Sequence, residues 1–144
     1  MDEAEARARF AAARVARLAT VRAGGAPHLV PVVFAVHGST VLLVVDEKPK
    51  RTKELQRLAN LRAEPRVSLL ADHYEDAWGS LWWVRADGRA RIVGTGPERD
   101  RAVAILQAKY PQYASEPPSG PVVAIDVERI SGWEASVGIT EGER

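Results

Sequence analysis

Four cationic side chains are crowded into six positions within the segment VVDEKPKRTKEL, residues 44–55. They are Lys48, Lys50, Arg51 and Lys53, and they come just before a stretch, about residues 52–63, whose apolar residues have helical spacing. Cations are unfavourable at a helix N-terminus unless an anion joins them, because unpaired N–H groups and the positive end of the helix dipole already lie there. The pattern therefore favours a phosphate or carboxylate site, with the hydroxyl of Thr52, as N-cap, and backbone N–H groups completing it.

The same cluster also fits a solvated charged face, and the sequence leaves that alternative open. The segment contains neither G-x-x-x-x-G-K nor G-x-G-x-x-G, so it is not a P-loop or a Rossmann fingerprint. A nucleic-acid binder is disfavoured, since one cluster makes few phosphate contacts and the formal net charge is only +1.

Few other residues are typical of a catalytic site. The chain has no cysteine, and the spacing of its three histidines does not suggest a metal site. His73 stands among acidic residues, where a surface hydrogen bond is the simplest interpretation. Trp78, in the acidic loop EDAWGS, is the tryptophan we expect to contact a ring or substrate. Trp82, Trp83 and Trp133 are equally well explained by packing, and on one strand Trp82 and Trp83 must point to opposite faces.

The remaining sequence predicts a mainly β protein with a few helices. Pro31 cannot donate a ladder hydrogen bond, so it indicates an edge strand or a bulge within 28–36. The predicted strands are 28–36, 40–45 and 64–74, with a strand or a helix-to-strand step at 14–22, a strand or hairpin at 81–95 and one or two strands at 122–138. The predicted helices are 2–13, 52–63 and one beginning at Pro97, and 111–121 is predicted to be a loop. Six or so strands at hairpin spacing favour a small antiparallel barrel over a βαβ sheet.

The totals are those of an ordinary globular domain. We expect a single domain over residues 1–144, with an N-terminal helix within 1–13 and a mobile tail at 139–144. The apolar content is 46% and the charged content 27%. No leader-like segment and no stretch of roughly 18 apolar residues is present, so we expect a cytoplasmic protein.

Three segments resemble the pyridoxamine 5′-phosphate oxidase-like split β-barrel superfamily, and within it the branch that depends on the deazaflavin coenzyme F420. They are LATVRAGGAPHLVPVVFAV, LLVVDEKPK and LANLRAEPRVSLLADHY, and the resemblance spans roughly residues 10–135. NLRAEPRVSLL (60–70) is its most specific part. The resemblance implies a six-stranded antiparallel split barrel that forms a homodimer, with cofactor sites between the subunits.

The resemblance also implies which residues bind the cofactor. The phosphate would lie on Lys48, Lys50, Arg51, Thr52 and Lys53, and the ring system would lie against the backbone near Pro31, Val32 and Val33. The expected activity is hydride transfer between reduced F420 and a small conjugated organic acceptor. The alternatives are an FMN-dependent reductase or oxidase of the same fold, and a carrier that binds F420 or a flavin without catalysis.

The charge of the coenzyme gives a separate argument for F420. Its phosphodiester and its carboxylate-bearing glutamate tail require more cations than FMN does. Arginines near the N-terminus could supply them, although a solvated helix face explains the same residues. These arginines are Arg7, Arg9, Arg14 and Arg17.

Overall fold

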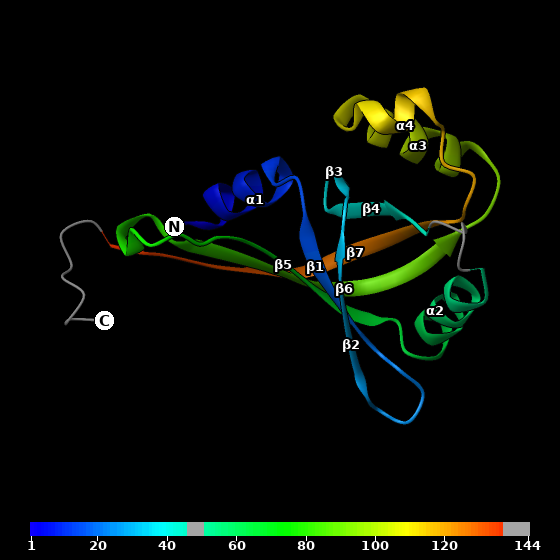
Figure 1. The fold of residues 1–144 in the computed structure, drawn as a ribbon, viewed down its shortest axis with the longest axis horizontal. Coiled ribbons are helices and arrows are strands. Elements are labelled where there is room, and N and C mark those ends of the chain that lie inside the picture. The colour runs from blue at the N-terminus through cyan, green and yellow to red at the C-terminus, as the bar shows by residue number, and fades with distance from the viewer. Residues whose placement is uncertain (46–50, 137–144) are drawn as a thin grey trace.

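The computed structural model describes residues 1–45 and 51–136, and within 51–55 it describes the backbone only. These residues form one seven-stranded antiparallel sheet in the order β2-β1-β5-β6-β7-β4-β3, with helices packed on it (Figure 1). The strands are β1 (Ala16–Val21), β2 (Pro27–Val32), β3 (Ala35–His37), β4 (Thr40–Val44), β5 (Arg66–His73), β6 (Trp82–Val93) and β7 (Val122–Glu134). The helices are α1 (Glu3–Ala12), α2 (Arg51–Ala63), α3 (Pro97–Lys109), α4 (Pro111–Ser115) and the short 3-10 helix η1 (Trp78–Ser80). No helix in the described ranges is long and apolar enough to cross a membrane.

The main core lies between the sheet and helices α1 and α2. Phe10 of α1 and Leu58 and Leu61 of α2 join buried side chains of the central strands in one cluster. Phe10 and Phe34 pack with their ring centroids 4.8 Å apart. A smaller cluster lies under α3, where Ala102 is buried with residues of β4, β6 and β7. The main cluster anchors α2 through its buried leucines and β2 through the partly buried Val30 and Val32, and these are the two elements that the sequence singles out.

The structure has one strand more than the six predicted, because the segment predicted as a single strand at 28–36 is divided. β2 ends at Val32 and β3 begins at Ala35, and the two strands lie at opposite edges of the sheet. Phe34, between them, turns into the core and is fully buried. Only Val33 and Phe34 join the two strands, so the sheet must curl until its two edges lie close together. Val33 is the last of the residues expected to face the ring.

The sheet decides between the alternatives that the sequence left open for segments 81–95 and 122–138. β6 is one continuous strand through Asp87 and Gly88, so these two residues form no hairpin turn. Its register with β7 shifts between them, as a bulge does. Gly88 is required there, since a Cβ would collide with the carbonyl oxygen of Asp126. β7 likewise forms a single strand, and the loop predicted at 111–121 begins with the short helix α4.

Candidate functional site

The first candidate element is the start of α2. The helix prediction is confirmed, with helix-forming residues throughout and with Leu58 and Leu61 anchored in the core. Lys48 and Lys50 lie outside the described residues. The backbone of Arg51 and Lys53 forms part of the first turns of the helix. The side chains of these two residues also lie outside the part of the chain that the structure describes. Thr52 lies inside the helix rather than before it, so the prediction that Thr52 is the N-cap is wrong.

The second candidate element is β2, and it lies at an edge of the sheet as Pro31 indicated. Pro31 pairs with Arg17 and Val32 with Ala16, both on β1, and β2 has no strand on its other side. A proline costs no ladder hydrogen bond at such an edge. Burial alternates along the strand, so Val30 and Val32 pack against the core while Leu29 and Pro31 are exposed. Leu29 is 67% exposed, and with Pro31 and Val33 it gives the edge an apolar surface.

A single hydroxyl group holds the chain where β2 ends. The backbone N–H of Phe34 donates to the Tyr110 hydroxyl at 3.1 Å, and that hydroxyl lies 2.7 Å from the Phe34 carbonyl oxygen and 3.0 Å from that of Arg14. Phe34 is outside the strands, so this side chain replaces the partners that a ladder would provide. Lys109 lies 4.1 Å from the centroid of the Phe34 ring and holds the end of α1 there, donating to the carbonyl oxygens of Ala11 at 3.0 Å and Ala13 at 2.7 Å.

A hollow of about 470 Å³ separates α2 from the turn that joins β1 to β2. Its lining residues are Arg22, Ala23, His28, Gln56, Arg57 and Asn60. The pKa of His28 is lowered, mainly by burial and also by the positive charges of Arg22 and Arg57. The hollow is therefore electropositive, and it carries no carboxylate among its lining residues. These polar residues are the part of the site that sequence reasoning missed.

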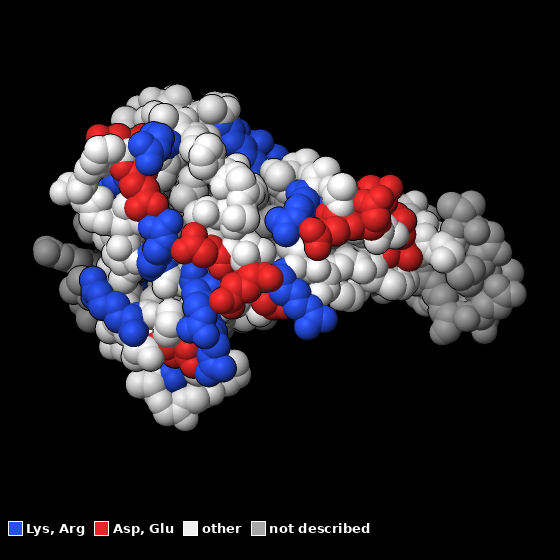
Figure 2. Space-filling view, turned by 180° about the vertical axis from the view of Figure 1, so that it is seen from behind, with Lys and Arg blue, Asp and Glu red and all other residues white. Residues whose placement is uncertain are grey.

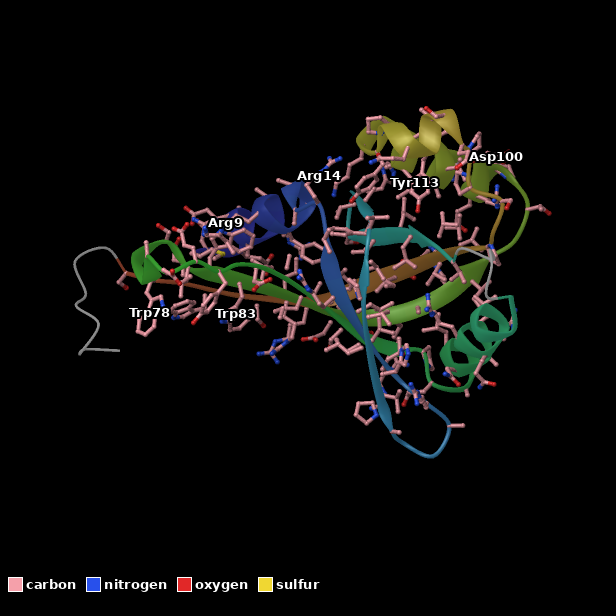
Figure 3. The ribbon with its side chains drawn as sticks, viewed as in Figure 1. Arg9, Arg14, Trp78, Trp83, Asp100 and Tyr113 are labelled. Atoms are coloured by element: carbon pink, nitrogen blue, oxygen red, sulfur yellow. The ribbon has the colours of Figure 1, made fainter. Side chains whose placement is uncertain are left out.

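The N-terminal arginines are engaged elsewhere in the chain. Arg7 pairs with Glu3 at 3.4 Å, Arg9 with Glu134 at 2.8 Å and Arg17 with Asp72 at 3.7 Å. Arg14 donates to the carbonyl oxygen of Lys109 at 3.0 Å, and its guanidinium lies over the Tyr110 ring at 4.7 Å. In Figure 3, Arg9 and Arg14 lie along α1, well away from α2. Within one chain they do not reach the hollow.

Trp78 is also distant from α2 within one chain. It begins η1 at the far end of the sheet and is 41% exposed, and Figure 3 places it at the opposite end of the molecule from α2. A cofactor bound at α2 of one chain could contact Trp78 only if a second chain supplied it. The prediction that Trp78 contacts the cofactor therefore depends on the predicted dimer.

The other tryptophans occupy both faces of the sheet, as the alternation of a strand requires. Trp82 packs against the core cluster, with the Arg9 guanidinium 5.5 Å from its ring centroid. Trp83 pairs across the strands with Trp133, and Arg85 lies 5.9 Å from the ring of Trp83. Figure 1 shows α1 above the left part of the β5–β6–β7 ribbon with no helix opposite it, whereas α2 lies below the right part.

The remaining charged groups form surface pairs. His73 lies 3.4 Å from Glu75 and both are exposed, which agrees with a surface contact. Arg91 binds Glu98 at 2.7 Å and Asp126 at 2.8 Å. Figure 2 shows cationic and acidic side chains interleaved over the face turned to the viewer, without a broad basic surface of the kind that nucleic acids require. In the described part of the chain, no group of three or more His, Asp or Glu residues is placed to hold a metal ion.

Comparison with known proteins agrees with this architecture. The family model described as pyridoxamine 5′-phosphate oxidase matches residues 2–134. A conserved hypothetical protein from Mycobacterium tuberculosis is 27% identical with a TM-score of 0.76, over 97% of this chain and 94% of that one. An FAD-binding protein from Mesorhizobium loti is 25% identical with a TM-score of 0.71, over 94% of this chain and 96% of that one.

A heme-binding protein from Mycobacterium smegmatis is similar in fold alone. It is 23% identical with a TM-score of 0.72, over 94% of this chain and 54% of that one. No curated protein matches the chain. The antiparallel sheet with few helices is consistent with the split barrel that the sequence resemblance implies. Because the family model covers nearly the whole sequence, the chain belongs to the pyridoxamine 5′-phosphate oxidase family.

Proposed function

We propose that the protein is a homodimeric oxidoreductase that binds coenzyme F420 and transfers hydride between the reduced coenzyme and a small conjugated organic acceptor. The observation that carries this proposal is that α2 and the edge strand β2 border one electropositive hollow. An apolar edge on β2 and a group of cations at α2 suit a molecule with a flat ring at one end and anionic groups at the other.

The residues of this chain bind and orient the cofactor in this proposal. The exposed edge of β2 supports the ring beside Pro31, Val32 and Val33. The start of α2, with the preceding lysines, takes the phosphate through charge-assisted hydrogen bonds. The bound deazaflavin supplies the hydride chemistry itself. No side chain of the described residues stands out as a proton donor, and water is the proton source that we propose.

The proposed dimer rests on the exposed side of the β5–β6–β7 ribbon. Trp133 and Leu70 are exposed there with Trp83 beside them. Figure 1 shows no helix of the described chain over the part of this side that lies opposite α1. Aromatic residues are enriched in protein interfaces. A second copy on this face would also bring a Trp78 from one chain toward the cofactor of the other.

A flavin cofactor is the second candidate. The 25% identical protein from Mesorhizobium loti is described as FAD-binding, which favours an isoalloxazine ring over a deazaflavin. On this alternative the protein is an FMN-dependent reductase or oxidase with the same ring and phosphate positions. A carrier without catalysis is the third candidate, and it requires the same binding residues.

Turnover separates the enzyme from the carrier. Reduced F420 and reduced FMN would each be mixed with the protein and a panel of conjugated acceptors, and reoxidation would be followed against a protein-free control. Steady turnover of F420 in excess of the protein supports the proposed reductase. Binding of F420 without turnover of any acceptor supports the carrier, and turnover of FMN alone supports the flavin enzyme.

A further inference from the structure

The hollow beside α2 is built from two rigid elements. Arg22 follows β1 directly, and its backbone is fixed by hydrogen bonds with Ala26 at 2.8 Å and Gly25 at 2.9 Å. The turn itself depends on Gly24 and Gly25, whose φ angles of 90° and 94° favour glycine. On the other side, Arg57 and Asn60 are three residues apart on one helix face. The backbone on both sides of the hollow is therefore fixed by the fold.

The described residues that line the hollow include two arginines and no carboxylate. Most arginines described above have a carboxylate partner within the chain, such as Arg9 with Glu134 and Arg91 with Asp126. In the described ranges, Arg22 makes no ion pair. Burial is the main cause of the lowered pKa of His28, and the positive charges of Arg22 and Arg57 lower it further. An anion placed there would be attracted by the positive charge of both arginines and would accept hydrogen bonds from Arg22.

Asn60 gives an independent indication of a ligand. Its side chain lines the hollow although the residue is only 9% exposed. Its amide oxygen accepts from Gln56 at 3.0 Å, but its amide NH₂ group has no hydrogen-bond acceptor among the described residues. Buried donors without an acceptor are rare and costly in folded proteins. An oxyanion in the hollow would satisfy this donor.

We propose that the hollow is a second anion subsite, in which Arg22, Arg57 and Asn60 bind a carboxylate or phosphate that lies beyond the first phosphate of the cofactor. This inference rests on the proposed function, in which the start of α2 holds that first phosphate. Arg57 lies roughly 8 Å further along the helix axis than Thr52, since each residue adds about 1.5 Å. FMN ends at its only phosphate, whereas F420 continues into carboxylates and FAD into a second phosphate.

The subsite would therefore select the cofactor. Affinities for FMN, FAD and F420 would be measured by fluorescence titration for the native protein and for Arg22→Ala. Arg62→Ala is the matched control, because Arg62 is exposed on the same helix and does not line the hollow. We expect Arg22→Ala to weaken F420 or FAD about tenfold while FMN is unaffected, the loss typical of one charge-assisted hydrogen bond. Arg22→Lys should recover part of that loss.

The arms of this titration distinguish the source of the anion. A loss confined to F420 assigns the subsite to a carboxylate, and a loss confined to FAD assigns it to a second phosphate. Equal weakening of all three cofactors would overturn the inference, because FMN has no second anion. No weakening of either longer cofactor would overturn it as well.

A second measurement tests the hollow without any cofactor. The imidazole of His28 would be titrated with pH by NMR, in the presence and absence of inorganic phosphate or glutarate at constant ionic strength. We expect saturable shifts and a raised His28 pKa, both reduced in Arg22→Ala and kept in Arg62→Ala. Identical responses in the native protein and Arg22→Ala would overturn the subsite. If none of the three cofactors binds the native protein, the proposed function fails, and the His28 titration still decides the subsite.

Discussion

Replacing Tyr110 by phenylalanine should destabilise the protein strongly although it removes only one oxygen atom. The hydroxyl accepts from the N–H of Phe34, and its single proton is shared between the carbonyl oxygens of Phe34, at 2.7 Å, and Arg14, at 3.0 Å. Phe34 is fully buried and stands between two strands. In Tyr110→Phe, its N–H and its C=O both lose the partner that the structure provides.

The magnitude follows from those two groups. A buried donor or acceptor left without a partner costs about 1–3 kcal/mol. Two such groups lower the free energy of unfolding, and a phenyl ring offsets part of this loss because it buries no hydroxyl. The net decrease in the free energy of unfolding should be about 2–4 kcal/mol. Domains of this kind have free energies of unfolding of about 5–15 kcal/mol, so the loss is a large share of the total. With a urea m-value of about 2 kcal/mol/M, the midpoint should fall by roughly 1–2 M.

Urea unfolding followed by tryptophan fluorescence measures this change directly. Tyr74→Phe is the matched control, because Tyr74 is 73% exposed and its hydroxyl should contribute little. Hydrogen exchange over residues 27–37 gives a local reading, in which the amide of Phe34 should lose protection in Tyr110→Phe. If the midpoints of Tyr110→Phe and Tyr74→Phe agree, the account of how the β2–β3 junction is held is refuted.

Three further predictions concern charge, shape and binding. Burial lowers the pKa of Lys109 to about 8, so the folded chain releases this proton more readily than the unfolded chain. The free energy of unfolding should therefore rise between about pH 8 and 10. Urea titrations across this range should show a smaller rise in Lys109→Met than in the native protein, and equal rises in the two proteins would contradict the prediction. Gly88→Ala should cost at least about 2 kcal/mol in the same assay, since its Cβ would collide with the backbone of Asp126, and an unchanged midpoint would rule that collision out. Lys50→Ala and Lys53→Ala should each weaken cofactor binding by about 1–3 kcal/mol in a fluorescence titration; if both bind like the native protein, the basic segment is not the phosphate site.

Local patterns predicted the elements that are specified locally. The spacing of Leu58 and Leu61 predicted α2, and Pro31 predicted an edge strand. The break after Val32 could not be predicted, because a residue far along the chain decides it. Val33 and Phe34 favour a strand on their own, and the Tyr110 hydroxyl, 76 residues away, provides the partners that allow Phe34 to leave the ladder.

The candidate site was predicted less completely, for the same reason. Arg9 looked available to a cofactor, but it pairs with Glu134, 125 residues away, and only the fold shows this contact. Arg22 and Arg57 are far apart in the sequence, so no local pattern connects them. The fold brings them to one hollow, because the glycine turn after β1 lies opposite α2. The polar i and i+3 pair of Arg57 and Asn60 on one face of α2 was the only local signal.

The central claim is that this chain binds a phosphate-bearing deazaflavin beside α2. Its most direct test is a fluorescence titration of the purified cofactor-free protein with F420 and, in parallel, with FMN. The account predicts micromolar or tighter binding of F420, with much weaker binding of FMN. Tighter binding of FMN than of F420 would support the flavin-dependent alternative instead. Binding of neither cofactor would contradict the proposed function altogether.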